Sequence, residues 1–293
     1  MKATDMNVSR APTSRWLKST QWLADNLGNV VVVDGSYYLP TENRNARTEY
    51  LAGHIPGAVF FDINAVADTS IDLPHMLPGP EQFGSTMSKL GISEKDTIVV
   101  YDNYNNSTVY SAPRVWWTLR IFGNKNVFIL DGGLPTWKAE GRKIEAGEVK
   151  RPAVKFNVEM DTNAVAMVSD VQQALNDKSA QIVDARSAGR FTGREPEPRP
   201  GLRSGHMPGA RNVPFTAIME NGKLASPAQI KQAFEKAGVD PDTPIITSCG
   251  SGVTACALAF GLHLIGWGKA AVYDGSWSEW GLIENDTPVA TGS

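Results

Sequence analysis

The sequence is poor in cysteine, has no long apolar run and carries no excess of positive charge. Two cysteines in 293 residues are too few for a disulfide framework and fit a reduced compartment. The apolar stretches, such as residues 30–33 and 255–265, are shorter than the about 18 residues of a membrane helix, so we expect no membrane span. A formal net charge of -3 argues against a broad nucleic-acid-binding surface, although local basic pockets remain open.

Two further absences bear on location and cofactors. The N-terminus shows no apolar segment of the kind that marks a secretory signal, and we therefore expect a cytoplasmic location. The four histidines and two cysteines do not cluster at metal-ligand spacing, so we predict no metal site. We predict no organic cofactor either.

What the chain does contain is an internal repeat. Residues 52–58 (AGHIPGA) and 204–210 (SGHMPGA) agree at five of seven positions, and each follows an apolar run that ends in aspartate. Residues 131–137 (DGGLPTW) and 274–280 (DGSWSEW) form a second pair, each after a β-prone run. At this length, two copies of one domain are the natural interpretation.

Short apolar runs alternate with longer amphipathic stretches in both halves, a pattern typical of parallel strands linked by helices. We predict an α/β fold with two tandem domains, each a mainly parallel β-sheet flanked by helices. The predicted bounds are 14–140 for the first domain, 141–165 for a linker and 166–290 for the second domain. The expected helices are 20–26, 80–89, 113–122, 168–176, 227–237 and 253–264.

Cys249 lies at a strand-loop-helix junction in the second half. When the halves are superposed on their Asp-Gly pairs, Asn106 and Ser107 fall opposite Cys249 and Gly250, so only the second copy offers a thiol. Converging N–H groups and the helix dipole favour the thiolate, which is the nucleophilic form. The alternative is an inert cysteine buried in a turn. Cys256, inside an apolar stretch, is interpreted as a core residue.

The segment CGSGVTA, which begins at Cys249, resembles the active-site loop of the 3-mercaptopyruvate sulfurtransferases of the rhodanese superfamily. The HIPGA, HMPGA, DGG and DGS segments resemble the structural signatures of rhodanese domains. The resemblance implies a catalytic C-terminal domain, a non-catalytic N-terminal domain and a site between them. It makes Cys249 the catalytic nucleophile and adds a set of substrate-binding loop residues: Gly250, Gly252, Val253 and Thr254.

A second resemblance concerns the donor. Residues 189–191 (GRF) and 195–199 (EPEPR) resemble the substrate-binding segment of the family, which implies that Arg190 and Arg199 grip the carboxylate and carbonyl of the donor. The uncharged loop after Cys249 favours a monoanionic α-keto acid over dianionic thiosulfate. The alternative is that both arginines are solvated charges on a Pro-rich loop, as we expect for Arg194 and Arg203.

The family also implies a Ser-His-Asp relay beside the cysteine. Ser251 is its catalytic serine here, and His75, in the segment HMLPG, resembles the histidine and is expected to line the substrate pocket. The family's aspartate falls at Asn64, and Asp62 is the other candidate, so the chain departs from a full relay. His54 and His206 recur in both halves, which indicates a structural role.

We expect Cys249 to take sulfur from 3-mercaptopyruvate as a persulfide, release pyruvate, and pass the sulfur to an acceptor. The expected acceptors are a thiol such as thioredoxin, a small dithiol, or cyanide. Three alternatives stay open: a thiosulfate sulfurtransferase, a silent binding module, and a cysteine-dependent phosphatase or arsenate reductase. The last class places an arginine six residues after its cysteine, where this chain has Ala255.

Overall fold

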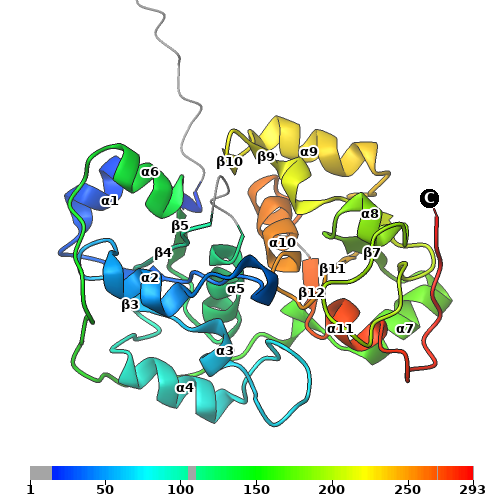
Figure 1. Cartoon of the computed structure of the whole chain (residues 1–293), viewed down its shortest axis with the longest axis horizontal. Coiled ribbons are helices and arrows are strands. Elements are labelled where there is room, and N and C mark those ends of the chain that lie inside the picture. The colour runs from blue at the N-terminus through cyan, green and yellow to red at the C-terminus, as the bar shows by residue number, and fades with distance from the viewer. Residues whose placement is uncertain (1–14, 105–109, 269, 293) are drawn as a thin grey trace, which may run out of the picture.

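The computed structural model describes residues 15–104, 110–268 and 270–292, and these form two similar parallel sheets (Figure 1). The first sheet has the strand order β1-β5-β4-β2-β3, with every neighbouring pair parallel. Its strands are β1 (Leu17–Lys18), β2 (Val31–Asp34), β3 (Val59–Phe60), β4 (Ile98–Tyr101) and β5 (Val127–Leu130).

The second sheet repeats this arrangement in the order β6-β12-β11-β7-β8, again with all neighbours parallel. Its strands are β6 (Val165–Ala166), β7 (Gln181–Asp184), β8 (Arg211–Asn212), β11 (Ile245–Ser248) and β12 (Ala270–Tyr273). A hairpin of β9 (Met219–Glu220) and β10 (Lys223–Leu224) stands apart from both sheets. The predicted fold class is thereby confirmed, whereas the predicted domain bounds stay a prediction.

Helices flank both sheets, and the predicted ones are present with ends shifted by no more than two residues. α10 begins at Ala255 rather than at 253, because the chain first turns at Gly252, whose φ is +76°. The helices are α1 (Thr20–Asn26), α2 (Ala46–Ala52), α3 (Ile63–Val66), α4 (Pro80–Lys89), α5 (Ala112–Ile121), α6 (Gly133–Ala139), α7 (Val168–Asp177), α8 (Ala188–Phe191), α9 (Pro227–Lys236), α10 (Ala255–Leu264) and α11 (Ser276–Trp280), with 3-10 turns η1 (Pro40–Glu42), η2 (Thr162–Ala164) and η3 (Phe215–Ile218).

The strand registers correct the sequence-based superposition of the two halves. Asp34 pairs with Tyr101 in the first sheet, and Asp184 pairs with Ser248 in the second. The residue after β4 is therefore the equivalent of the residue after β11, which places Asp102 opposite Cys249. Asn106 and Ser107 lie outside the described residues. The superposition failed because ten residues separate β4 from α5 whereas six separate β11 from α10.

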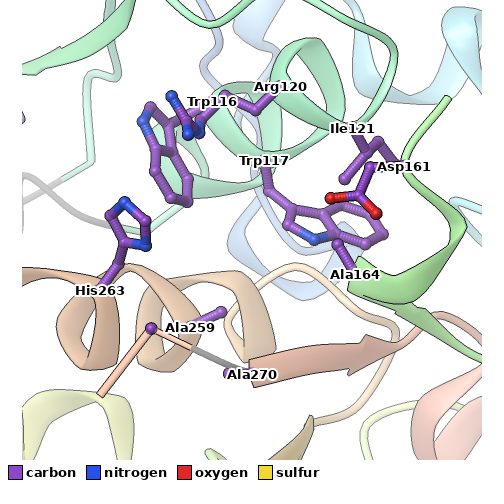
Figure 2. A pocket seen from close by; sticks show the side chains of 10 residues that line it. Trp116, Trp117, Arg120, Ile121, Asp161, Ala164, Ala259, His263 and Ala270 are labelled. Atoms are coloured by element: carbon purple, nitrogen blue, oxygen red, sulfur yellow. The ribbon is translucent and has the colours of Figure 1, made fainter. Parts of the chain in front are cut away.

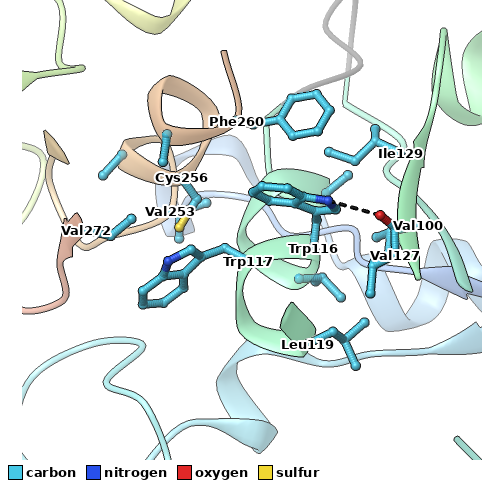
Figure 3. Packing of buried hydrophobic residues seen from close by; sticks show 14 of the residues in the cluster. Val100, Trp116, Trp117, Leu119, Val127, Ile129, Val253, Cys256, Phe260 and Val272 are labelled. Carbon is cyan, nitrogen blue, oxygen red and sulfur yellow. Dashed lines mark hydrogen bonds between the residues drawn. The ribbon is translucent and has the colours of Figure 1, made fainter. Parts of the chain in front are cut away.

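The two domains meet along α5 and α10, and one apolar cluster extends through both (Figure 3). Trp116 of α5 packs edge-on against Phe260 of α10 at 4.8 Å between ring centroids. Its indole N–H donates to the Val127 carbonyl at 3.1 Å, which ties α5 to β5. A cavity of about 140 Å³ lies at the same seam, beside Trp117 and His263, away from the predicted site residues (Figure 2). The seam is thus a packed interface that fixes the domains against each other.

In the described part of the chain, every helix is too short or too polar to cross a membrane.

Candidate active site

Cys249 lies directly after β11, at the carboxyl edge of the second sheet, and is 2% exposed. Its backbone is held by the segment after β12: its N–H donates to Ser276 Oγ at 3.1 Å, and its carbonyl accepts the Trp277 N–H at 3.0 Å. The next carbonyl, of Gly250, accepts both the N–H and the hydroxyl of Ser278 at 2.8 and 2.7 Å. These bonds fix where the thiol stands.

Ser276 adopts a left-handed backbone, with φ of +48°, which is unusual for a residue other than glycine. Its hydroxyl accepts from Cys249 and donates to the Tyr273 carbonyl at 2.8 Å. The sharp turn of 274–276 therefore brings the ends of β11 and β12 together under the cysteine. This explains why the repeated Asp-Gly segment lies so close to the site.

His75 reaches the cysteine loop from the N-terminal domain. Its Nδ1 is 3.1 Å from Ser251 Oγ and 3.3 Å from the Ser251 carbonyl, and both residues are 5% exposed. Burial, together with the positive charges of Arg114 and Arg199, lowers the pKa of His75 to about 3. The imidazole is therefore neutral near pH 7 and contacts Ser251 as an uncharged partner.

Tyr37 is a site residue that the sequence analysis missed. Its ring packs edge-on against His75, 4.7 Å between centroids, and its hydroxyl lies 3.4 Å from Arg199 Nη2. Burial raises the pKa of Tyr37, so its phenol stays protonated. Only an aromatic residue shortly after a strand end could have hinted at this position. Its contacts link two predicted site residues, His75 and Arg199.

Arg190 belongs to a buried charge network. Its Nε and Nη2 lie 3.2 and 2.5 Å from the two carboxylate oxygens of Glu197, a fork-on-fork contact. Glu197 also pairs with Arg186 at 2.8 Å, and Arg186 pairs with Asp184 at 2.6 Å. A Cβ on Gly250 would stand 2.9 Å from Arg190 Nη2, so this guanidinium lies against the cysteine loop.

Arg199 and His75 line a pocket of about 440 Å³ with residues of the loop 64–74. Arg199 contacts a neutral group, the Tyr37 phenol. The structure therefore brings Arg190, Arg199, His75, Ser251 and the cysteine loop together.

Asp62 does not join them in the described chain, because its carboxylate caps α3. It accepts the N–H groups of Asn64 and Ala65 at 3.0 and 3.3 Å. Asn64, the other position considered for a relay aspartate, lines the pocket of Arg199 and carries no charge. The contact of His75 with Ser251 thus occurs without the carboxylate partner that a full relay requires.

The other loop residues occupy places that explain their identities. A Cβ on Gly252 would lie 2.8 Å from Arg114 Nη1 and 2.9 Å from the Asp274 carbonyl, so the loop passes too close for a side chain. Val253 is buried, and Thr254 precedes α10 as its N-cap. Arg114 and Asp274, which touch this loop, were also missed. The signal for Arg114 was a charge inside an otherwise apolar helix.

Four other residues considered in the sequence have partners that hold them in structural positions. Cys256 is fully buried in α10, and burial raises the pKa of its thiol far above the usual range, in keeping with a core role. His54 and His206 contact the carbonyls of Tyr50 and Phe191 at 2.9 and 2.8 Å, as structural histidines do. The solvated interpretation of Arg203 was wrong, because it donates to carbonyls of residues 280, 281 and 287.

Comparison with known proteins defines the class. The model of the rhodanese-like domain matches residues 19–140 and 167–282, and the chain therefore belongs to the rhodanese family. It is 44% identical to the 3-mercaptopyruvate sulfurtransferase of Escherichia coli K12 over 280 residues, 94% of this chain and 98% of that protein. It is 40% identical to the human 3-mercaptopyruvate sulfurtransferase over 273 residues, 91% of this chain and 92% of that protein.

Solved structures agree. The crystal structure of SseA from Escherichia coli, described as a 3-mercaptopyruvate sulfotransferase with the rhodanese fold, matches with a TM-score of 0.82 at 42% identity, covering 89% of this chain and 98% of that one. Tum1 from Saccharomyces cerevisiae matches with a TM-score of 0.84 at 30% identity, covering 94% and 97%. The predicted resemblance to the two-domain rhodanese superfamily is confirmed.

Proposed function

We propose that this chain is a 3-mercaptopyruvate sulfurtransferase in which Cys249 carries the transferred sulfur. The donor is the one named in relatives that are 40–44% identical over more than nine-tenths of the chain. The observation that carries the role of Cys249 is its position: a buried thiol after β11, in the loop that also holds Ser251 and that lies against Arg190 and His75.

The balance of charge supports a monoanionic donor. In the described part of the site, Arg114 pairs with Asp274, Arg186 with Asp184 and Arg190 with Glu197. Arg199 contacts a neutral phenol instead, so with Cys249 as the neutral thiol the site carries a net charge of one positive. One carboxylate balances that charge, whereas dianionic thiosulfate would exceed it. In this proposal Arg199 grips the carboxylate, and Arg190, fixed by Glu197, orients the carbonyl.

The loop of the first domain shows what such a backbone does with an anion. Asp102, the equivalent of Cys249, is fully buried, and its Oδ2 accepts the N–H groups of Tyr110, Ser111 and Ala112 at 3.1, 2.8 and 2.8 Å. By the same geometry, the N–H groups of Gly250, Gly252, Val253 and Thr254 would surround sulfur on Cys249. Such donors stabilise a negative charge where it forms.

The reaction then balances without metal or cofactor. The Cys249 thiolate attacks the donor sulfur, the sulfur-carbon bond breaks, and its electron pair leaves on the enolate of pyruvate. The enolate takes up the proton that the donor thiol brought, which leaves an anionic persulfide on Cys249. A thiol acceptor, a dithiol such as reduced thioredoxin, or cyanide then removes the outer sulfur and restores the thiolate.

Ser251 and His75 handle the proton in this scheme. The neutral imidazole holds the Ser251 hydroxyl at 3.1 Å, so the hydroxyl can pass a proton toward the enolate carbon. Asp62 has no part in it, because its carboxylate caps α3.

We further propose domain bounds of 14–140 and 166–290 with the linker 141–165, and a cytoplasmic location, which suits two free cysteines.

The test compares pyruvate formation from 3-mercaptopyruvate with thiocyanate formation from thiosulfate and cyanide, for the wild type, Arg190→Ala and Arg199→Ala. We expect mercaptopyruvate to be strongly preferred and both variants to lose that preference. If thiosulfate is the better donor, the enzyme is a thiosulfate sulfurtransferase. Intact-mass spectrometry after incubation with donor identifies the cysteine that carries the sulfur. We expect a mass gain of about 32 Da, one sulfur atom, in the wild type and in Cys256→Ser but not in Cys249→Ser.

A further inference from the structure

Arg114 is a buried cation of the N-terminal domain whose contacts cross to the C-terminal domain. It lies in the first turn of α5 and is 3% exposed. Its Nη2 is 2.8 Å from Asp274 Oδ1 and donates to the His75 carbonyl at 2.5 Å, and its Nη1 donates to the Gly252 carbonyl at 3.4 Å. One guanidinium thus touches both loops of the site and the segment after β12.

Asp274 connects Arg114 to the turn that holds Cys249. It is 2% exposed, and its second oxygen accepts the Leu77 N–H at 2.7 Å. Two residues later, Ser276 accepts the Cys249 N–H. The chain of contacts therefore runs from α5 through Asp274 to the backbone of the nucleophile. A shift of Asp274 would move the turn on which Cys249 rests.

The same pair shapes the loop that carries His75. His75 has φ of +64°, a conformation that costs free energy for a residue other than glycine. Arg114 holds its carbonyl and Asp274 holds the N–H of Leu77, two residues on. These bonds keep the strained turn in place and the imidazole against Ser251 and Tyr37.

We propose that Arg114 and Asp274 act together as a positioning pair that sets the His75 loop of one domain against the Cys249 loop of the other. The inference rests on the proposed function and adds two residues that touch no reacting atom. Burying two charges is costly, and apolar residues could fill the same space. The Arg114 guanidinium, however, contacts Asp274 and the carbonyls of His75 and Gly252 through two of its nitrogens, which fixes direction as well as distance. Misplacement of a reacting group by about 1 Å can cost about 100-fold in rate.

The test uses Arg114→Lys, Arg114→Met and Asp274→Asn in the full chain. Arg114→Lys keeps the positive charge but loses the planar guanidinium, so it separates positioning from charge balance. It also keeps the proposal testable if Arg114→Met does not fold. Arg44→Met is the matched control, because Arg44 also forms a partly buried ion pair, with Glu49 at 2.5 Å, that lies within the N-terminal domain. Steady-state pyruvate formation gives kcat and KM, and amide hydrogen exchange reports on 249–254 and 274–278.

We expect kcat to fall about 100-fold in Arg114→Met and Asp274→Asn with KM little changed, and Arg114→Lys to recover part of that loss. Exchange at 249–254 and 274–278 should rise, although Arg114 lies in the other domain. Unchanged kcat in the Arg114 variants, or an equal loss in Arg44→Met, would overturn the proposal. A wild type without turnover would refute the proposed function. The positioning role of Arg114 and Asp274 would then be tested by hydrogen exchange alone, and unchanged exchange in the variants would refute it.

Discussion

Asp102 and Cys249 occupy the same place in the two halves of the molecule, each directly after the central strand of its sheet. In the first half, a carboxylate accepts three backbone N–H groups of its own loop. In the second half, the loop is four residues shorter and surrounds a thiol. One copy therefore holds a buried carboxyl group where the loop of the other is suited to hold an anion that comes and goes.

Asp102→Ala should destabilise the protein, because three N–H groups that the carboxylate now accepts would be left buried without an acceptor. We expect a loss of about 2 to 3 kcal/mol in the free energy of unfolding. Denaturant titration measures it, with Asp25→Ala, at an exposed position in α1, as the control. An Asp102 variant as stable as this control would show that the buried bonds contribute little.

Asp34 predicts a dependence of stability on pH. Burial raises the pKa of this carboxyl from 3.8 to about 6, against hydrogen bonds from Ser36 and Tyr101 that lower it. Because the folded pKa lies above the unfolded one, the protonated group favours folding below about pH 4, and this advantage is lost as the pH rises through 6. Asp34→Asn should thus add up to about 3 kcal/mol at pH 8 and about half of that at pH 5.

The equivalent position of the second domain provides the control for Asp34. Asp184 forms an ion pair with Arg186 at 2.6 Å, so Asp184→Asn should lower stability at pH 8 rather than raise it. Urea midpoints of both variants at pH 5 and pH 8 give the comparison. The explanation fails if the two substitutions shift the midpoint in the same direction.

Glu197→Gln should widen the choice of donor. Removing this carboxylate raises the net charge of the site from one positive to two, which favours a dianion over a monoanion by an amount of order 1 kcal/mol. We expect the ratio of kcat/KM for thiosulfate to that for mercaptopyruvate to rise about tenfold. Glu195→Gln, an exposed carboxylate on the same loop, should leave the ratio unchanged. If the thiosulfate-to-mercaptopyruvate ratio of kcat/KM is the same in Glu197→Gln and Glu195→Gln, the net charge of the site does not determine the choice of donor.

His75 should stay neutral across the working range of pH. With its pKa lowered to about 3 by burial and by the charges of Arg114 and Arg199, the ring nitrogen shifts of His75 should not move between pH 5 and 8 in ¹⁵N NMR spectra. Arg199→Met should raise the pKa of His75, because one of the two neighbouring positive charges that lower it is gone. A titration midpoint near 6.5 in the wild type would contradict the buried, uncharged imidazole.

The sequence predicts the fold well because its strands and helices have strong local signals. Apolar residues 31–33 and 182–183 each lead up to an aspartate, and prolines mark the first turns of α4, α5 and α9. Cys249, Arg190 and Arg199 stood in motifs that could be recognised.

Contacts between the domains left no such signal. Arg114 and Asp274 lie 160 positions apart in the sequence and meet only when α5 packs against the second domain. Tyr37 is one of seven tyrosines, and nothing nearby in the sequence marks its contact with His75. The residue of the first half that is equivalent to Cys249 was predicted wrongly, because a superposition on the Asp-Gly pairs takes no account of the difference in loop length.

In the proposed function, the seam between the domains makes the chemistry of one half depend on side chains of the other. One half supplies Cys249, Ser251, Arg190 and Arg199, and the other supplies His75, Tyr37 and Arg114. The first half would thus form a wall of a site whose nucleophile it lacks, and substitutions in it would change a reaction that is centred on the other half.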